Sequence, residues 1–117
     1  MHNNFIELVE KVEKLANDEL ERANKEHPLF HSLHEGYAVL QEEIDEVIEI
    51  NKEAMENKEV MWTAIKNDLE DEAVRWAKKT QICLTEATAE MIQCIAMCKK
   101  IIESEKNYEQ KANPETL

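Results

Sequence analysis

Sharp turns are scarce in this chain, because its 117 residues include a single glycine and two prolines. Charged residues make up 34% of the sequence and aromatic residues only 5%. A sheet protein would be richer in aromatic and β-branched residues, so this profile favours helices. The length suits one domain with one core. We predict an all-α protein with a single helical domain over residues 1–112 and a frayed tail over residues 113–117.

Apolar residues at helical spacing predict the first two helices. The first is expected over about residues 4–25, ahead of the break at Pro28. Ser32 can cap the central helix, and Glu35 three residues later can reach back to the cap amide. The central helix is expected to extend to about residue 56.

Two further helices are expected after the central one. Asn57 is interpreted as a break and as the cap of a short third helix. The last helix is expected over about residues 71–105. It is apolar most of the way round, which is typical of a helix buried on several sides. A chain this small can hardly cover such a helix alone, so we infer an oligomer.

The formal net charge of −12 excludes several classes of partner. Nucleic-acid backbones and anionic membranes both require a basic surface. No apolar run is long enough to span a bilayer, and the N-terminus lacks the pattern of a signal peptide. Three cysteines, an odd number, fit a reducing compartment. We expect a cytoplasmic protein that binds neither nucleic acid nor membrane.

A carboxylate lies where the central helix should be apolar. At ~100° per residue, Glu43 projects between Gly36, Val39, Val47 and Ile50. An ionised, unpaired carboxylate in such a face costs several kcal/mol. A bound cation is the first candidate for compensation, and an ion pair with a lysine or arginine of a neighbouring helix is the alternative.

The last helix repeats this anomaly at Glu90, which falls in the middle of its apolar face with Glu86 and Gln93 one turn to either side. Facing helices in bundles build metal sites by bringing such groups together. Carboxylate and carbonyl oxygens suit hard cations, so the two helices predict a site for Mg²⁺ or Mn²⁺.

Basic and histidine side chains offer candidate substrate contacts. Arg75 and Lys79 precede Glu90 by two to four turns of the last helix and could reach phosphate oxygens, although both could equally be surface charges. His31 and His34 are interpreted as capping or surface histidines. Each is also a candidate contact to substrate at the mouth of the central helix.

The motifs resemble a known family. The segment Leu29-Phe30-His31-Ser32-Leu33-His34-Glu35-Gly36-Tyr37-Ala38-Val39-Leu40-Gln41-Glu42-Glu43-Ile44-Asp45-Glu46 is similar to the first segment of MazG-like nucleotide pyrophosphohydrolases, with Glu42-Glu43-x-x-Glu46 matching their EExxE motif. The segment that begins at Ala89-Glu90 resembles their second motif, ExxD. The resemblance is weakest in the first helix and in residues 57–80.

The resemblance implies a fold and an activity. It implies a four-helix bundle of the all-α NTP pyrophosphatase type, completed by oligomerisation as a homodimer or homotetramer. The implied enzyme uses Mg²⁺ to split a nucleoside triphosphate or dNTP into a monophosphate and pyrophosphate, as a house-cleaning activity on the nucleotide pool.

The resemblance also implies site residues. Glu43, Glu46 and Glu90 would be metal ligands, and Glu42 a ligand or the group that orients the attacking water. Gln93 stands where the family has Asp; its amide oxygen can bind Mg²⁺ but is neutral, and Glu86 is close enough to substitute. Two other functions therefore remain open: a catalytically weak nucleotide-binding or regulatory relative, and a plain helical interaction module.

Overall fold

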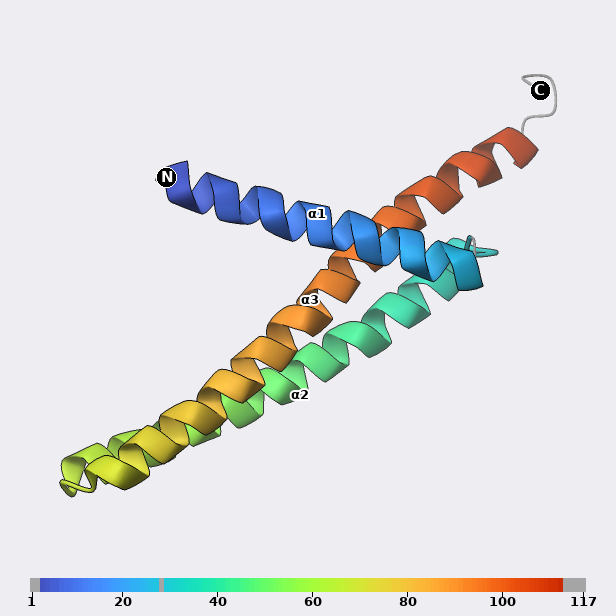
Figure 1. The fold of residues 1–117 in the computed structure, drawn as a ribbon. Helices are drawn as coiled ribbons and strands as arrows, with labels where there is room; N and C mark the ends of the chain where they lie inside the picture. The colour runs from blue at the N-terminus through green and yellow to red at the C-terminus, as the bar shows by residue number, and fades with distance from the viewer. Residues whose placement is uncertain (1–2, 28, 113–117) are drawn as a thin grey trace. The chain divides into compact units, whose positions relative to one another are not determined.

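Three helices make up the computed structural model of the chain, which describes residues 3–27 and 29–112 (Figure 1). They are α1 (Asn3–Glu26), α2 (Leu33–Lys66) and α3 (Glu70–Ala112). The described residues contain no strand, so the prediction of an all-α protein is confirmed. The expected tail over residues 113–117 lies outside the described part of the chain, as does Pro28.

The prediction of a helix break at Asn57 is wrong, because α2 continues without interruption to Lys66. Asn57 does not cap a new helix: its side-chain amide donates a hydrogen bond to Cys83 Sγ of α3 at 3.5 Å. The prediction of four helices per chain therefore fails at this point. The short third helix is the C-terminal part of α2.

The chain reverses instead at residues 67–69. Asp68 has a φ of 57°, in the left-handed region that favours glycine. The amide of Leu69 donates to the carbonyl oxygen of Ala64 at 2.9 Å, which closes the end of α2. Asp68 thus turns the chain two residues before α3 begins at Glu70.

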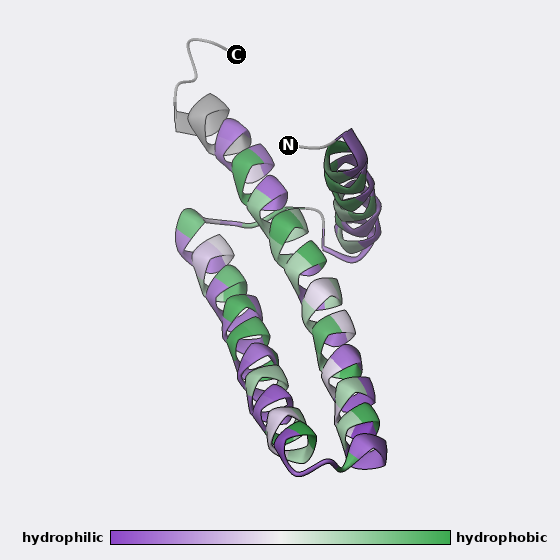
Figure 2. Cartoon of the chain, turned by 90° about the vertical axis from the view of Figure 1, so that its left-hand side faces the viewer, coloured by the Kyte–Doolittle hydropathy of each residue, from purple (hydrophilic) through white to green (hydrophobic). Residues whose placement is uncertain are grey.

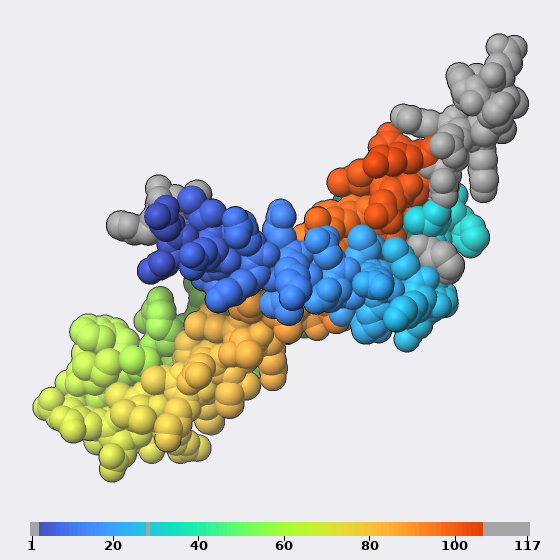
Figure 3. Space-filling view, turned by 45° about the horizontal axis from the view of Figure 1, so that its top comes forward, coloured from blue at the N-terminus to red at the C-terminus, as the bar shows by residue number. Residues whose placement is uncertain are grey.

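The chain divides into two compact units. The first unit comprises Met1–Glu43 and Ile92–Leu117, and the second comprises Ile44–Met91. In the first unit, α1 crosses the C-terminal half of α3 (Figure 3), where Ala16, Leu20 and Ala96 are buried. The second unit is an antiparallel hairpin of α2 and α3.

Small side chains dominate the buried contacts of the second unit. Its buried residues are Val47, Ala54, Ala64, Ala73, Cys83 and Ala87. Side chains of this size allow two helices to approach closely, but they bury little apolar area each. The hairpin is therefore thin, and many larger apolar side chains stay outside it.

The exposed residues of α2 differ from those that helical periodicity suggests. Tyr37, Ile44 and Ile48 recur at helical spacing, as the residues of one apolar face would, yet they are exposed in the single chain. The face that packs against the rest of the chain includes Gly36, Glu43 and Val47. Figure 2 shows green, hydrophobic residues along all three helices. Among the large apolar side chains, Trp62, Val74 and Ile82 are each more than half exposed.

None of the helices in the described residues is both long and apolar enough to cross a membrane.

Candidate metal and ligand site

Three carboxylates from α2 and α3 converge in the structure. Glu43, Glu46 and Glu90 each offer one oxygen atom, and these oxygens all lie within 4.8 Å of one another. We call this group the carboxylate cluster. Glu46 and Glu90 belong to the same hairpin, and Glu43 precedes Glu46 by three residues on the same helix, so helix geometry fixes its place beside Glu46.

Burial distinguishes the three side chains of the carboxylate cluster. Glu43 and Glu90 are half-buried, whereas Glu46 is exposed. The Oε2 atom of Glu90 is buried and has no hydrogen-bond partner among the described residues. A buried carboxylate oxygen without a partner is destabilising, so a cation or a hydrogen-bond donor placed at this atom would stabilise the fold.

The spacing of the carboxylate cluster can be compared with the size of an ion. Oxygen ligands of Mg²⁺ lie at 2.0–2.1 Å in an octahedron, so adjacent ligands are about 2.9 Å apart and opposite ones about 4.2 Å. The oxygens of the cluster lie within 4.8 Å of one another, so some pairs would have to approach by up to about 2 Å to hold one ion. Rotation of an exposed glutamate side chain such as Glu46 supplies a movement of that size, so the donor set fits a hard divalent cation.

The other predicted acids lie outside the carboxylate cluster. Glu42 and Glu86 are exposed on α2 and α3. Burial of the thiol raises the pKa of Cys83, with smaller contributions from the charges of Glu53 and Glu86. Among the described residues, Glu86 is not one of the acids whose oxygens converge with Glu90.

The predicted substrate-binding residues make contacts of their own. Lys79 Nζ lies 4.3 Å from the centre of the Trp76 ring, and Arg75 Nη1 lies 3.6 Å from Glu72 Oε1. At 1.5 Å per residue, Lys79 is about 16 Å from Glu90 along the α3 axis, and Arg75 about 22 Å. Both are too far to touch a phosphate held at the carboxylate cluster of the same chain. His34 is exposed.

Gln93 contacts α1. Glu19 accepts hydrogen bonds from Arg22 Nε at 3.1 Å and from Arg22 Nη2 at 2.5 Å. Arg22 first, and Gln93 to a smaller extent, hold the pKa of Glu19 below its usual range, against an opposing effect of burial. A carboxylate can only accept, so the group of Gln93 that favours ionised Glu19 is its NH₂, and its amide oxygen is left for another partner.

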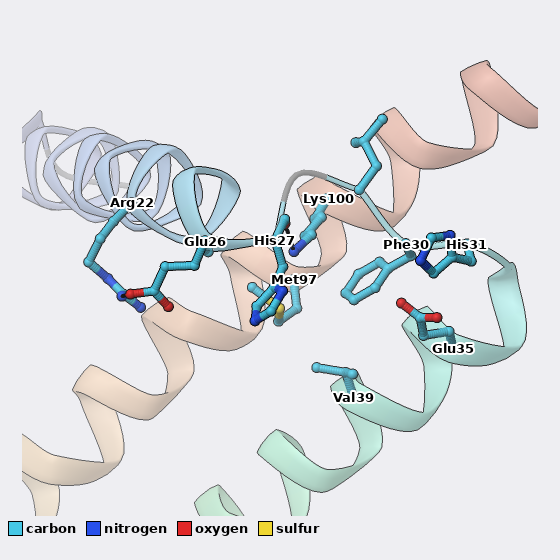
Figure 4. A pocket seen from close by; sticks show the side chains of 11 residues that line it. Arg22, Glu26, His27, Phe30, His31, Glu35, Val39, Met97 and Lys100 are labelled. Carbon is cyan, nitrogen blue, oxygen red and sulfur yellow. Dashed lines mark hydrogen bonds and ion pairs between the residues drawn. The ribbon is translucent and has the colours of Figure 1, made fainter.

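The first unit contains a cavity of about 430 Å³, which we call the α1–α3 cavity (Figure 4). Its polar lining comes from Arg22, Glu26, His27, His31, Glu35 and Lys100, and its apolar lining includes Phe30, Val39 and Met97. Val39 precedes Glu43 by four residues, so the cavity and this member of the carboxylate cluster share one face of α2.

Lys100 shapes the wall of the α1–α3 cavity. It is 4% exposed, and its ammonium donates to the backbone carbonyl oxygen of His27 at 2.5 Å, just beyond the end of α1. The same ammonium lies 4.7 Å from the centre of the Phe30 ring. Burial lowers the pKa of Lys100, with a smaller opposite effect of Glu35. A cation at a helix C-terminus is favourable, so Lys100 fixes the end of α1.

Several of these residues were missed in the sequence. Lys100 and Ser104 follow the buried Ala96 at four-residue intervals, so their spacing was a usable signal for a buried face of α3. Glu19, Arg22 and Glu26 follow one another at spacings of three and four, which favours contacts along one side of α1. Their connection to Gln93 had no signal in the sequence.

Fold and site together define an all-α protein with a carboxylate cluster on two antiparallel helices and, in the first unit, a cavity lined by polar and apolar residues. Comparisons with models of protein families, with curated proteins and with solved structures gave no match.

Proposed function

We propose that this protein is a Mg²⁺-dependent nucleoside triphosphate pyrophosphohydrolase that releases a nucleoside monophosphate and pyrophosphate. The observation that carries the proposal is the convergence of Glu43, Glu46 and Glu90, with their oxygens within 4.8 Å of one another. These are the three acids that the MazG-like resemblance marks as metal ligands. The orphaned Oε2 atom of Glu90 supports a cation at this place.

Different residues of the chain would hold the metal ion and orient the attacking water. Glu43, Glu46 and Glu90 would hold the ion, and Gln93 could add its amide oxygen, which is left for another partner. Mg²⁺ or Mn²⁺, when bound, supplies positive charge to the phosphate oxygens. Glu42 is exposed beside Glu43 and would orient the attacking water by accepting its proton.

We further propose that a second copy of the chain completes a four-helix bundle, as a homodimer or homotetramer. The exposed Tyr37, Ile44 and Ile48 on α2, together with Trp62 and Ile82, support an apolar surface that another copy covers. We expect the enzyme to act on nucleotide pools in the cytoplasm.

The deciding experiment is a pyrophosphate-release assay across all NTPs and dNTPs with Mg²⁺ and with Mn²⁺. Release is expected from at least one nucleotide, and it should be lost in Glu43→Gln and in Glu90→Gln. Glu49→Gln, an exposed acid of α2 outside the carboxylate cluster, is the matched control and should retain activity. Activity retained in both cluster variants would sink the proposal.

Thermal melting distinguishes the two alternative functions. A catalytically weak nucleotide-binding relative, which Gln93 in place of Asp favours, would be stabilised by Mg²⁺ plus nucleotide without releasing pyrophosphate. A helical interaction module would show neither stabilisation nor release.

A further inference from the structure

Arg22 belongs to α1, the helix that crosses the C-terminal half of α3 (Figure 3). Its side chain lines the α1–α3 cavity and donates hydrogen bonds to Glu19 from two nitrogen atoms, Nε and Nη2. Glu26 lies on its other side, with Oε1 at 3.8 Å from Arg22 Nη1. Figure 4 shows Arg22 and Glu26 together at one edge of the cavity.

Gln93 ties this pair to α3. It is near enough to Glu19 to help lower the pKa of that carboxyl, and it lies one helical turn, about 5 Å, beyond Glu90. Gln93, Glu19 and Arg22 are therefore neighbours, beginning one turn from Glu90 along α3. Arg75 and Lys79, the basic residues expected to meet phosphate, are farther away along α3.

Arg22 keeps donors for a further partner. A guanidinium has five N–H donors, and the fork to Glu19 uses only two of its three nitrogen atoms. The side chain is 57% exposed even with both glutamates beside it. Two parallel N–H donors of a planar guanidinium match two oxygen atoms of a phosphate. A carboxylate bonded to the other side of the guanidinium, such as Glu19, fixes the direction in which these donors point.

We propose that Arg22 binds the phosphate chain of the substrate, and that Glu19, which accepts hydrogen bonds from two of its nitrogen atoms, is the positioning residue that holds Arg22 in place. This inference rests on the proposed function. The other charged groups of the α1–α3 cavity are Glu26, Glu35 and Lys100; Lys100 is already bonded to the His27 carbonyl oxygen and stacked on Phe30, which leaves Arg22 to meet the phosphates.

The proposal also explains why an amide suits position 93. An aspartate there would bring a second negative charge toward Glu19, and neighbouring carboxylates repel each other. Gln93 is neutral and instead favours the ionised form of Glu19, which bonds to Arg22.

Steady-state kinetics with Mg²⁺ test the roles of Arg22 and Glu19. Arg22→Ala and Glu19→Gln are each expected to raise KM about tenfold with little change in kcat, because a binding contact is lost. Arg22→Lys, which keeps the charge without the fork, should recover part of the loss. Glu21→Gln and Lys25→Ala, exposed on α1 outside this cavity, are the matched controls and should leave KM unchanged.

Equilibrium binding separates this inference from the proposed function. If the wild type hydrolyses no nucleotide, the proposed function fails, and calorimetry with inorganic triphosphate and Mg²⁺ still tests Arg22. Arg22→Ala should weaken the binding of inorganic triphosphate and of a nucleoside triphosphate by the same factor, about tenfold. Equal binding by wild type and Arg22→Ala overturns the inference. So does a loss confined to the nucleotide, because Arg22 would then contact the base or sugar.

Discussion

Ser104 Oγ of α3 accepts a hydrogen bond of 3.1 Å from the backbone amide of Phe30, in the connection between α1 and α2. The same hydroxyl donates to the carbonyl oxygen of Lys100 at 2.7 Å, and Ser104 is only 1% exposed. One buried side chain thus accepts a hydrogen bond from a backbone amide in a loop, where no regular secondary structure supplies the acceptor.

Ser104→Ala should lower the free energy of unfolding by about 0.5–1.5 kcal/mol, because the hydrogen bond that the buried hydroxyl accepts from the Phe30 amide is lost. Urea denaturation measures the change. Thr85→Ala is the matched control: it removes a hydroxyl that also bonds a carbonyl four residues earlier, but at an exposed position, and should change stability by less than about 0.5 kcal/mol. Equal effects of the two substitutions would contradict this account of Ser104.

Gly36→Ala should destabilise the protein although alanine is the better helix former. A Cβ at position 36 would lie 2.7 Å from Ile101 Cγ1 and 3.1 Å from Phe30 Cδ2. In an exposed helix the change would add about 1 kcal/mol of stability, whereas overpacking here should cost about 1–3 kcal/mol. Thermal melting checks the sign. Adding Ile101→Ala removes the nearest of these atoms and leaves only Phe30 Cδ2, so Gly36→Ala should then be less harmful than in the wild-type background.

Asp68→Gly should stabilise the turn between α2 and α3 by about 0.5–1 kcal/mol. Asp68 has a φ of 57°, which costs an ordinary residue conformational energy that glycine does not incur. The same change at Asp71, in the first turn of α3, should instead destabilise by about 1 kcal/mol. A lower melting temperature for Asp68→Gly would show that the aspartate side chain stabilises the turn by more than its backbone conformation costs.

Glu19 should make stability fall in acid. Its folded-state pKa is lowered, chiefly by the hydrogen bond to Arg22, from an ordinary value of 4.5. The unfolded state therefore binds a proton first, and the stability that Glu19 contributes is fully present above about pH 5 and lost as pH falls through the folded pKa. Glu19→Gln should show a shallower loss of stability between pH 5 and pH 3 in urea titrations, since its amide does not titrate. Glu21→Gln, whose pH dependence should match the wild type, is the control.

The residues of the carboxylate cluster could be read from the sequence because helix periodicity is local. At 3.6 residues per turn, Glu43 and Glu46 share a side of α2, and Glu90 falls on an otherwise apolar side of α3. Their separation, within 4.8 Å, depends on how the two helices pair. The prediction of a break at Asn57 was wrong for a related reason. Capping was inferred from neighbouring residues alone, whereas the Asn57 side chain bonds to Cys83, which is distant in the sequence.

Other parts of the chain could not be predicted in this way. Tyr37, Ile44 and Ile48 satisfy the apolar period but remain exposed, because Gly36, Glu43 and Val47 occupy the contact with α3. Lys100 and Ser104 bond to backbone atoms of the α1–α2 connection, which the identity of neighbouring side chains does not reveal.

The sequence by itself determined that the chain is helical and which side chains share each helix face, since both follow from spacing along one helix. Only the tertiary structure decided which faces meet and which polar groups are neighbours, including Gln93 and Glu19. The physical reason is that helix geometry is set by neighbours in the sequence, whereas packing is set by groups far apart in it.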